Sequence, residues 1–196
     1  KSINIDFLSS AAHKFHGPKG VGFTYINKST KIKSFICGGP QERGLRAGTE
    51  SVHNIVGMTK ALEIADKNME QEAKHVLSIK EYMIDNLRKL FPDIHFNGES
   101  GDIKNSTYTI LNVCLPISND KAAMLDFNLD LKGIACSRGS ACQSGSSEGS
   151  HVLNEIQSED QKKFPSVRFS FSHNNKIEEV DYLSLIHISE PTRQSL

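Results

Sequence analysis

Residues 12–22 read AHKFHGPKGVG, and this stretch decides which fold we expect for the chain. It places Lys14 between two histidines, after an apolar run and before a glycine-rich turn. Burial lowers the pKa of a lysine, and an enclosed neutral amine at the junction of a strand and a loop is a nucleophile that forms Schiff bases. Most lysines are instead solvated at the surface. The segment alone leaves that alternative open, so the rest of the sequence has to decide.

Three further segments support a common interpretation, namely GGPQERGLRAGTE at residues 38–50, SRGSACQS at residues 137–144 and VRFS at residues 167–170. Together with residues 9–26, they resemble, in order, four blocks of the cysteine desulfurases. These enzymes use pyridoxal phosphate and supply sulfur for iron–sulfur clusters. The resemblance covers about residues 3–183 and points to the long-loop branch of that family.

The resemblance implies an α/β fold, the fold type I of pyridoxal-phosphate-dependent transferases, truncated at its start. Residues 1–68 would form the C-terminal part of the large cofactor-binding domain, and residues 69–182 the small C-terminal α+β domain with the catalytic-cysteine loop. Residues 183–196 depart from the family and read like a translation of the adapter DNA used in sequencing libraries. We therefore expect a non-native tail there, with a divergent helix as the alternative. Because upstream parts of the pocket are absent, we expect a C-terminal fragment that binds the cofactor poorly by itself.

The resemblance assigns the Schiff-base lysine to Lys14, and Lys19 is the competing choice. His13 is expected to contact the cofactor or to move a proton, because histidine titrates near neutral pH. A packed loop histidine is the alternative for His13, and His16 has the weaker claim to a role.

The phosphate of the cofactor needs donors on both sides of the site. The family often carries a hydroxyl residue where this chain has Ala11, so Ser9 or Ser10 is expected to replace it, Ser10 being our choice. Thr49 precedes a predicted helix, and helix N-termini bind phosphate well. In similar proteins this threonine reaches the phosphate in the other subunit, which implies a homodimer with shared sites. The alternative is that Thr49 only caps the helix.

Cys142 is the residue that we expect to carry sulfur, because its neighbours are small and the segment around it lacks apolar residues. The nucleophile has to be a thiolate, and Arg138 is a nearby cation that favours one. Cys114 lies among apolar residues and is expected to be a core residue. Cys136 has no clear role.

The resemblance implies that the parent protein is a cysteine desulfurase, which converts L-cysteine to L-alanine and leaves a persulfide on Cys142. Arg168 would bind the carboxylate of the substrate in a bidentate manner, with a surface ion pair as the alternative. The sulfur would pass to an iron–sulfur scaffold or another acceptor protein. Cys142 is also a candidate ligand for a transient [2Fe–2S] cluster. Three alternatives stay open: a selenocysteine lyase, a non-catalytic sulfur-binding module and an inactive gene fragment.

The composition fits a globular protein, with 37% hydrophobic and 23% charged residues among 196. The formal net charge is zero, so electrostatics favours neither nucleic acid nor an anionic membrane as a partner. No apolar run approaches the roughly 20 residues of a membrane span. Without an export signal, the four cysteines are expected to be reduced thiols in a cytoplasmic protein. A zinc site is disfavoured, because Cys136 and Cys142 lack a Cys-x-x-Cys spacing.

Hydrophobic periodicity predicts an alternation of strands and helices. The expected strands are residues 6–11, 21–26, 108–115, 134–137 and 167–172. The expected helices are residues 49–66, 70–90, 122–131, 151–156 and 177–183. Pro92 is expected to end the second helix, and Gly133 to follow the third as its C′ residue. Residues 143–150 are expected to form a mobile loop.

Overall fold

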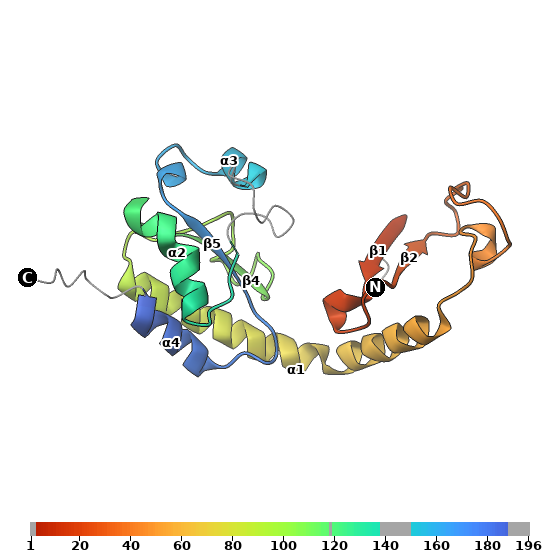
Figure 1. The fold of residues 1–196 in the computed structure, drawn as a ribbon, viewed down its shortest axis with the longest axis horizontal. Helices are drawn as coiled ribbons and strands as arrows, with labels where there is room; N and C mark the ends of the chain where they lie inside the picture. Colours follow the sequence, from red (N-terminus) through yellow and green to blue (C-terminus); the bar gives the residue numbers. More distant parts are fainter. Residues whose placement is uncertain (1–2, 118, 138–149, 188–196) are drawn as a thin grey trace, which may run out of the picture. The chain divides into compact units, whose positions relative to one another are not determined.

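The computed structural model describes residues 3–117, 119–137 and 150–187 (Figure 1). The chain divides into two compact units, Lys1–Met69 and Glu70–Leu196.

The first unit is built on an antiparallel hairpin of β1, Phe7–Ala11, and β2, Gly22–Ile26. The register runs from Phe7 opposite Ile26 to Ala11 opposite Gly22. A short 3-10 turn, η1 at Ala12–Phe15, directly follows β1. The two strands therefore hold the segment AHKFHGPKGVG as their connection, as the sequence predicts.

Helix α1 runs without interruption over 39 residues, Val52–Leu90. The expected division into helices at residues 49–66 and 70–90 is therefore wrong. No proline or glycine lies between the two segments, so nothing in the sequence breaks the backbone hydrogen bonding there. The buried residues of α1 all lie in its second half, from Val76 to Leu87, and belong to the second unit.

The second unit contains an antiparallel sheet in the order β3, His95–Phe96, then β4, Ile110–Cys114, then β5, Ser166–Ser170. Its helices, besides the end of α1, are α2 at Asn119–Leu131, α3 at His151–Ile156 and α4 at Ile177–His187, with a 3-10 turn η4 at Gln161–Lys163.

One face of this sheet carries the core, because strand side chains alternate between the two faces. Leu111, Val113 and Val167 are fully buried on that face. They belong to one cluster with side chains of α1, α2 and α4. Figure 1 shows α1 and α4 on this side of the sheet and α3 on the other. Apolar burial thus fixes which face of β5 remains for polar residues.

The segments around the cysteine loop differ partly from expectation. Residues 134–137 form no strand, since the structure gives only an isolated bridge between Ser137 and Arg168. Helix α3 has the expected bounds. Helix α4 continues past residue 183 to His187, and Leu183 is buried in the core cluster. Gly133 is confirmed as the residue that ends α2, because its φ is +75° and its N–H donates to Asp130.

Lys80 is completely buried, although it carries a charge and lies on the core side of α1. Its Nζ donates to Ser106 Oγ and to the carbonyl oxygen of Thr107, each at 2.7 Å. Burial lowers the pKa of Lys80 from its usual 10.5, and the charge of Asp102 partly offsets this. The unfolded chain therefore binds more protons than the folded one just below pH 10.5, so stability rises with pH in that window.

We expect Lys80→Ala to destabilise the second unit by about 2–4 kcal/mol, because it leaves a cavity and two unsatisfied acceptors. Lys74→Ala is the matched control, since Lys74 is exposed on the same helix, and its effect should stay below about 0.5 kcal/mol. Urea denaturation followed by circular dichroism measures both. Equal effects of the two substitutions would contradict an anchoring role for Lys80.

No helix in the described ranges is both long enough and apolar enough to span a membrane.

Candidate active site

The turn that carries Lys14 is held by backbone hydrogen bonds around one buried side chain. Ala12 is completely buried, its N–H donates to the carbonyl of Val21 at 3.0 Å, and its carbonyl accepts from Gly17 at 2.8 Å. His13 and Lys14 project outward from this turn and are exposed. The expectation of an enclosed lysine is therefore not met within the first unit. The strands and the helix of the first unit cover only the base of the turn that carries Lys14.

The turn packs on the start of α1. A Cβ atom at Gly57 would lie 2.8 Å from Pro18, so glycine at this position permits the close approach. Thr49 lies just before the same end of α1, which begins at Val52. The position next to the helix start belongs to Ser51, whose Oγ accepts from Asn54. Within the part of the chain described, the Thr49 hydroxyl makes no hydrogen bond, so capping does not account for it.

The residues predicted to hold a cofactor all belong to the first unit. They supply the exposed amine of Lys14, the exposed imidazole of His13, and the hydroxyls of Ser10 on β1 and of Thr49. An amine suits an aldehyde, and hydroxyls beside a helix N-terminus suit a phosphate. The chemistry of this donor set fits pyridoxal phosphate.

Arg168 lies in the middle of β5, in the second unit. Its N–H donates to the carbonyl of Ser137 at 2.7 Å, and its carbonyl accepts from Ser137 at 3.1 Å. On the other side β5 pairs with β4, where Asn112 stands opposite Arg168. The guanidinium Nε is buried and has no hydrogen-bond partner among the described residues. A buried cationic donor without a partner is costly, so this position suits an anionic ligand.

The cysteines differ sharply in exposure. Cys142 and Arg138 lie outside the described residues. Cys114 is confirmed as buried, and its Sγ donates to the carbonyl of Gln161 at 3.3 Å. Burial raises the pKa of the Cys114 thiol, and a hydrogen bond with Ser166 offsets only part of this rise. Cys114 is therefore a poor nucleophile.

The remaining two cysteines belong to different units. Cys37 is exposed in the first unit, and Cys136 is half-buried in the second. No group of three or more His, Cys, Asp or Glu side chains suited to a metal occurs among the described residues. The prediction of Cys142 as a cluster ligand concerns a residue outside them.

Sequence reasoning missed a set of amides beside Arg168. Asn97 is buried after β3 and is hydrogen-bonded to Asn112 and Gln157. One signal was available, because Asn112 interrupts the apolar strand ILNVC at residues 110–114. Nothing in the sequence showed that the partners of Asn97 lie 15 and 60 residues away.

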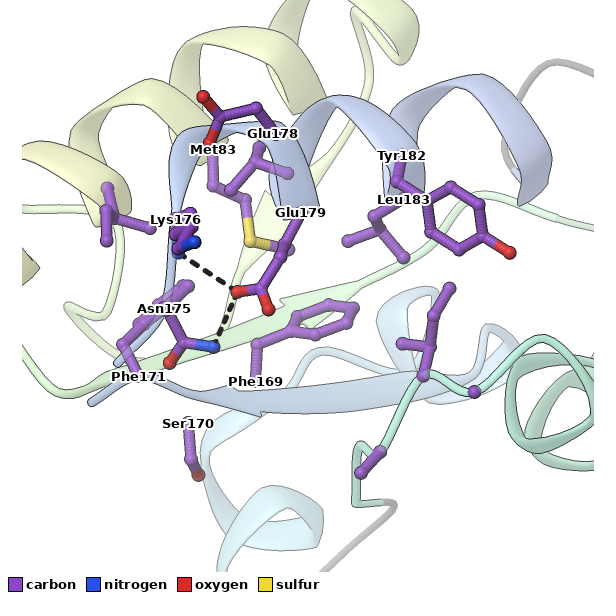
Figure 2. Close-up of a pocket in the computed structure, with 15 residues that line it drawn as sticks. Met83, Phe169, Ser170, Phe171, Asn175, Lys176, Glu178, Glu179, Tyr182 and Leu183 are labelled. Carbon is purple, nitrogen blue, oxygen red and sulfur yellow. Dashed lines mark hydrogen bonds between the residues drawn. The ribbon is translucent and has the colours of Figure 1, made fainter. Parts of the chain in front are cut away.

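A cavity of about 460 Å³ opens in the second unit between α1, α4 and β5 (Figure 2). Its wall is mainly apolar, with Met83, Phe169 and Leu183 labelled in the view. The carboxylate of Glu179 accepts from Asn175 Nδ2 at 2.9 Å and from the Lys176 N–H at 3.0 Å. These bonds lower the pKa of Glu179 and tie it to the start of α4. None of the predicted site residues lines this cavity.

Comparison with known proteins gives a consistent result. The Aminotransferase class-V family matches residues 1–183. A cysteine desulfurase of Bradyrhizobium diazoefficiens is 42% identical over 184 residues, which are 92% of this chain and 44% of that protein. Cysteine desulfurase IscS of Dictyoglomus turgidum is 39% identical over 92% of this chain and 44% of its own length. The chain thus spans less than half the length of these relatives.

Solved structures agree with the sequences. A NifS-like protein superposes with a TM-score of 0.75 and 35% identity, over 92% of this chain and 45% of its own. SspA in complex with cysteine superposes with a TM-score of 0.61 and 30% identity, over 88% of this chain and 46% of its own. The predicted fold is confirmed, namely the mixed α/β fold type I of pyridoxal-phosphate enzymes over about half of its length.

Proposed function

The chain belongs to the Aminotransferase class-V family, and on this basis we propose that the protein containing it is a cysteine desulfurase. The relatives at about 40% identity carry that name. The observation that carries the proposal is the buried Nε of Arg168, which has no partner among the described residues. A carboxylate of an amino acid is the anion that it would bind.

The proposed reaction balances without an added oxidant. L-cysteine and the thiol of Cys142 give L-alanine and a persulfide on Cys142, as the substrate C–S bond breaks and an S–S bond forms. Arg168 holds the substrate carboxylate through charge-assisted hydrogen bonds. Cys142 acts as the thiolate that accepts the sulfur. His13 moves a proton at the reacting end of the substrate.

Four residues would hold pyridoxal phosphate. Lys14 would bind it covalently through Nζ, His13 would contact it, and the hydroxyls of Ser10 and Thr49 would donate to its phosphate. The cofactor supplies an electron sink for the substrate's α-carbon. We further propose that Thr49 serves the site of a second copy in a homodimer. An iron–sulfur scaffold or another acceptor would then take the sulfur, and a transient [2Fe–2S] cluster would use Cys142.

The full-length protein, loaded with pyridoxal phosphate, is the material that tests this function. With L-cysteine and a reducing thiol, we expect equal amounts of L-alanine and sulfide, measured by chromatography and by a colorimetric sulfide assay. Formation of pyruvate instead of alanine would contradict the proposal. Alanine formed from L-selenocysteine alone would favour a selenocysteine lyase.

We expect Arg168→Lys to lower kcat/KM for L-cysteine about a hundredfold, because lysine lacks the planar fork that binds a carboxylate through two bonds. Steady-state kinetics on the full-length protein measures this. Arg88→Lys is the matched control, since Arg88 lies on α1 over the ring of Phe96. An Arg88 effect as large as that at Arg168 would indicate a general loss of stability.

A further inference from the structure

A set of polar side chains forms a connected network in the second unit. Asn97 Nδ2 donates to Asn112 Oδ1 at 2.8 Å and to Ser166 Oγ at 3.0 Å. Gln157 Nε2 donates to Asn97 Oδ1 at 2.7 Å and to Ser166 Oγ at 2.9 Å. We call these four residues the amide relay. It joins α3, β4 and β5 to the segment after β3.

The amide relay lies on the face of the sheet that carries Arg168. Ser166 precedes Arg168 by two residues on β5. Asn112 on β4 is the cross-strand partner of Arg168. Residues two apart on a strand share a face, and cross-strand partners have Cβ atoms about 5 Å apart. The side chains of Ser166 and Asn112 therefore lie on the same face of the sheet as the side chain of Arg168 and next to it in register.

The side-chain oxygens of Ser166 and Asn112 already accept hydrogen bonds within the amide relay. Asn97 donates to both oxygens, and Gln157 donates to Ser166 as well. An acceptor that is satisfied by a buried amide gains little from an arginine. This explains how the Nε of Arg168 stays buried and yet has no partner among the described residues.

We propose that the amide relay is a positioning device for Arg168, which occupies the neighbouring acceptors and so leaves the guanidinium available for the substrate carboxylate. Asn97 is its central positioning residue and does not touch the substrate. The proposal rests on the function proposed above, where Arg168 binds the carboxylate.

Removal of Asn97 frees one acceptor in particular. In Asn97→Ala, Ser166 Oγ keeps its bond from Gln157, while Asn112 Oδ1 loses the bond from Asn97. An acceptor left unsatisfied carries a cost, so Asn112 then recruits the guanidinium across the strands. The substrate has to compete for Arg168, and its binding weakens.

The test uses the full-length protein loaded with pyridoxal phosphate. We expect Asn97→Ala to raise KM for L-cysteine about tenfold while kcat changes less than about twofold. The double substitution Asn97→Ala with Asn112→Leu removes the stray acceptor and should return KM to within about threefold of the parent. Asn105→Ala is the matched control, because this amide bonds only to Asp102 in the described structure, and KM should not change.

A second readout does not depend on catalysis. The Nε–H signal of Arg168 in a ¹H–¹⁵N spectrum is assigned by its disappearance in Arg168→Lys. Without substrate, we expect it to move downfield in Asn97→Ala and to return in the double variant. Asn97→Leu, which is close to asparagine in shape, carries no charge and cannot donate to Asn112, replaces Asn97→Ala if the latter fails to fold, and it should shift KM and the signal in the same direction.

The outcomes separate the two proposals. An unchanged KM and an unmoved signal in Asn97→Ala would overturn the positioning role. A double variant as impaired as the single one would show that the amide relay is merely structural, and it would overturn the proposal too. If the parent forms no alanine, the proposed function fails, while the three positions of the Nε–H signal still decide on the amide relay.

Discussion

Lys14→Ala is expected to abolish desulfuration in the full-length protein, with a loss of at least about a thousandfold in kcat. The turn after β1 presents Lys14 on the surface of the first unit, and a buried Ala12 fixes the base of that turn. Alanine keeps the backbone of this turn and removes the only amine that the resemblance assigns to the cofactor. The loss should therefore be chemical and leave the fold intact.

The measurement identifies the amine directly. Borohydride treatment of the cofactor-loaded protein should leave a pyridoxyl mass on the peptide that contains Lys14, and none in Lys14→Ala. Lys19→Ala is the matched control, because Lys19 is an exposed lysine in the same segment. A label on Lys19, or full activity of Lys14→Ala, would reverse the assignment.

Cys142→Ser is expected to lower the rate of alanine formation from L-cysteine by at least about a thousandfold, since a serine hydroxyl is not an effective acceptor of sulfur. Among the other cysteines, Cys114 is buried and its pKa is raised, so it cannot readily replace the lost thiolate. Alkylation of the persulfide followed by mass spectrometry should find the extra sulfur on Cys142 in the parent only.

Cys37→Ser provides the control for this experiment. Cys37 is an exposed thiol whose Sγ donates to the carbonyl of Ser34 at 3.8 Å. Its replacement should leave the rate within about twofold of the parent. If Cys142→Ser retained activity and the sulfur appeared on Cys136, the half-buried neighbour would be the acceptor.

Short-range patterns in the sequence predicted most elements of this fold. The hairpin around Lys14 and the helix from His151 to Ile156 follow from local turn and capping signals, with Ser150 accepting from Leu153 at the helix start. The resemblance to cysteine desulfurases also predicted the family, because four sequence blocks in the same order are far more specific than any single block.

Properties that depend on packing could not be predicted in this way. The burial of Lys80 depends on acceptors 26 and 27 residues away, and no periodicity in the sequence shows such a pairing. The exposure of Lys14 has the same origin, since enclosure is a property of what surrounds a residue. The continuity of α1 was not predicted, although residues 67–69 between the two expected helices contain no helix breaker.

The pairing of Ser137 with Arg168 has a consequence for how this protein family can vary. Ser137 is bonded to β5 through its own backbone, and Ser150 begins α3, whose end is bonded to β5 through Gln157. Ser137 and Ser150 are therefore each held in place by hydrogen bonds that do not involve the residues between them. Insertions and deletions there should be tolerated over evolution without moving the arginine.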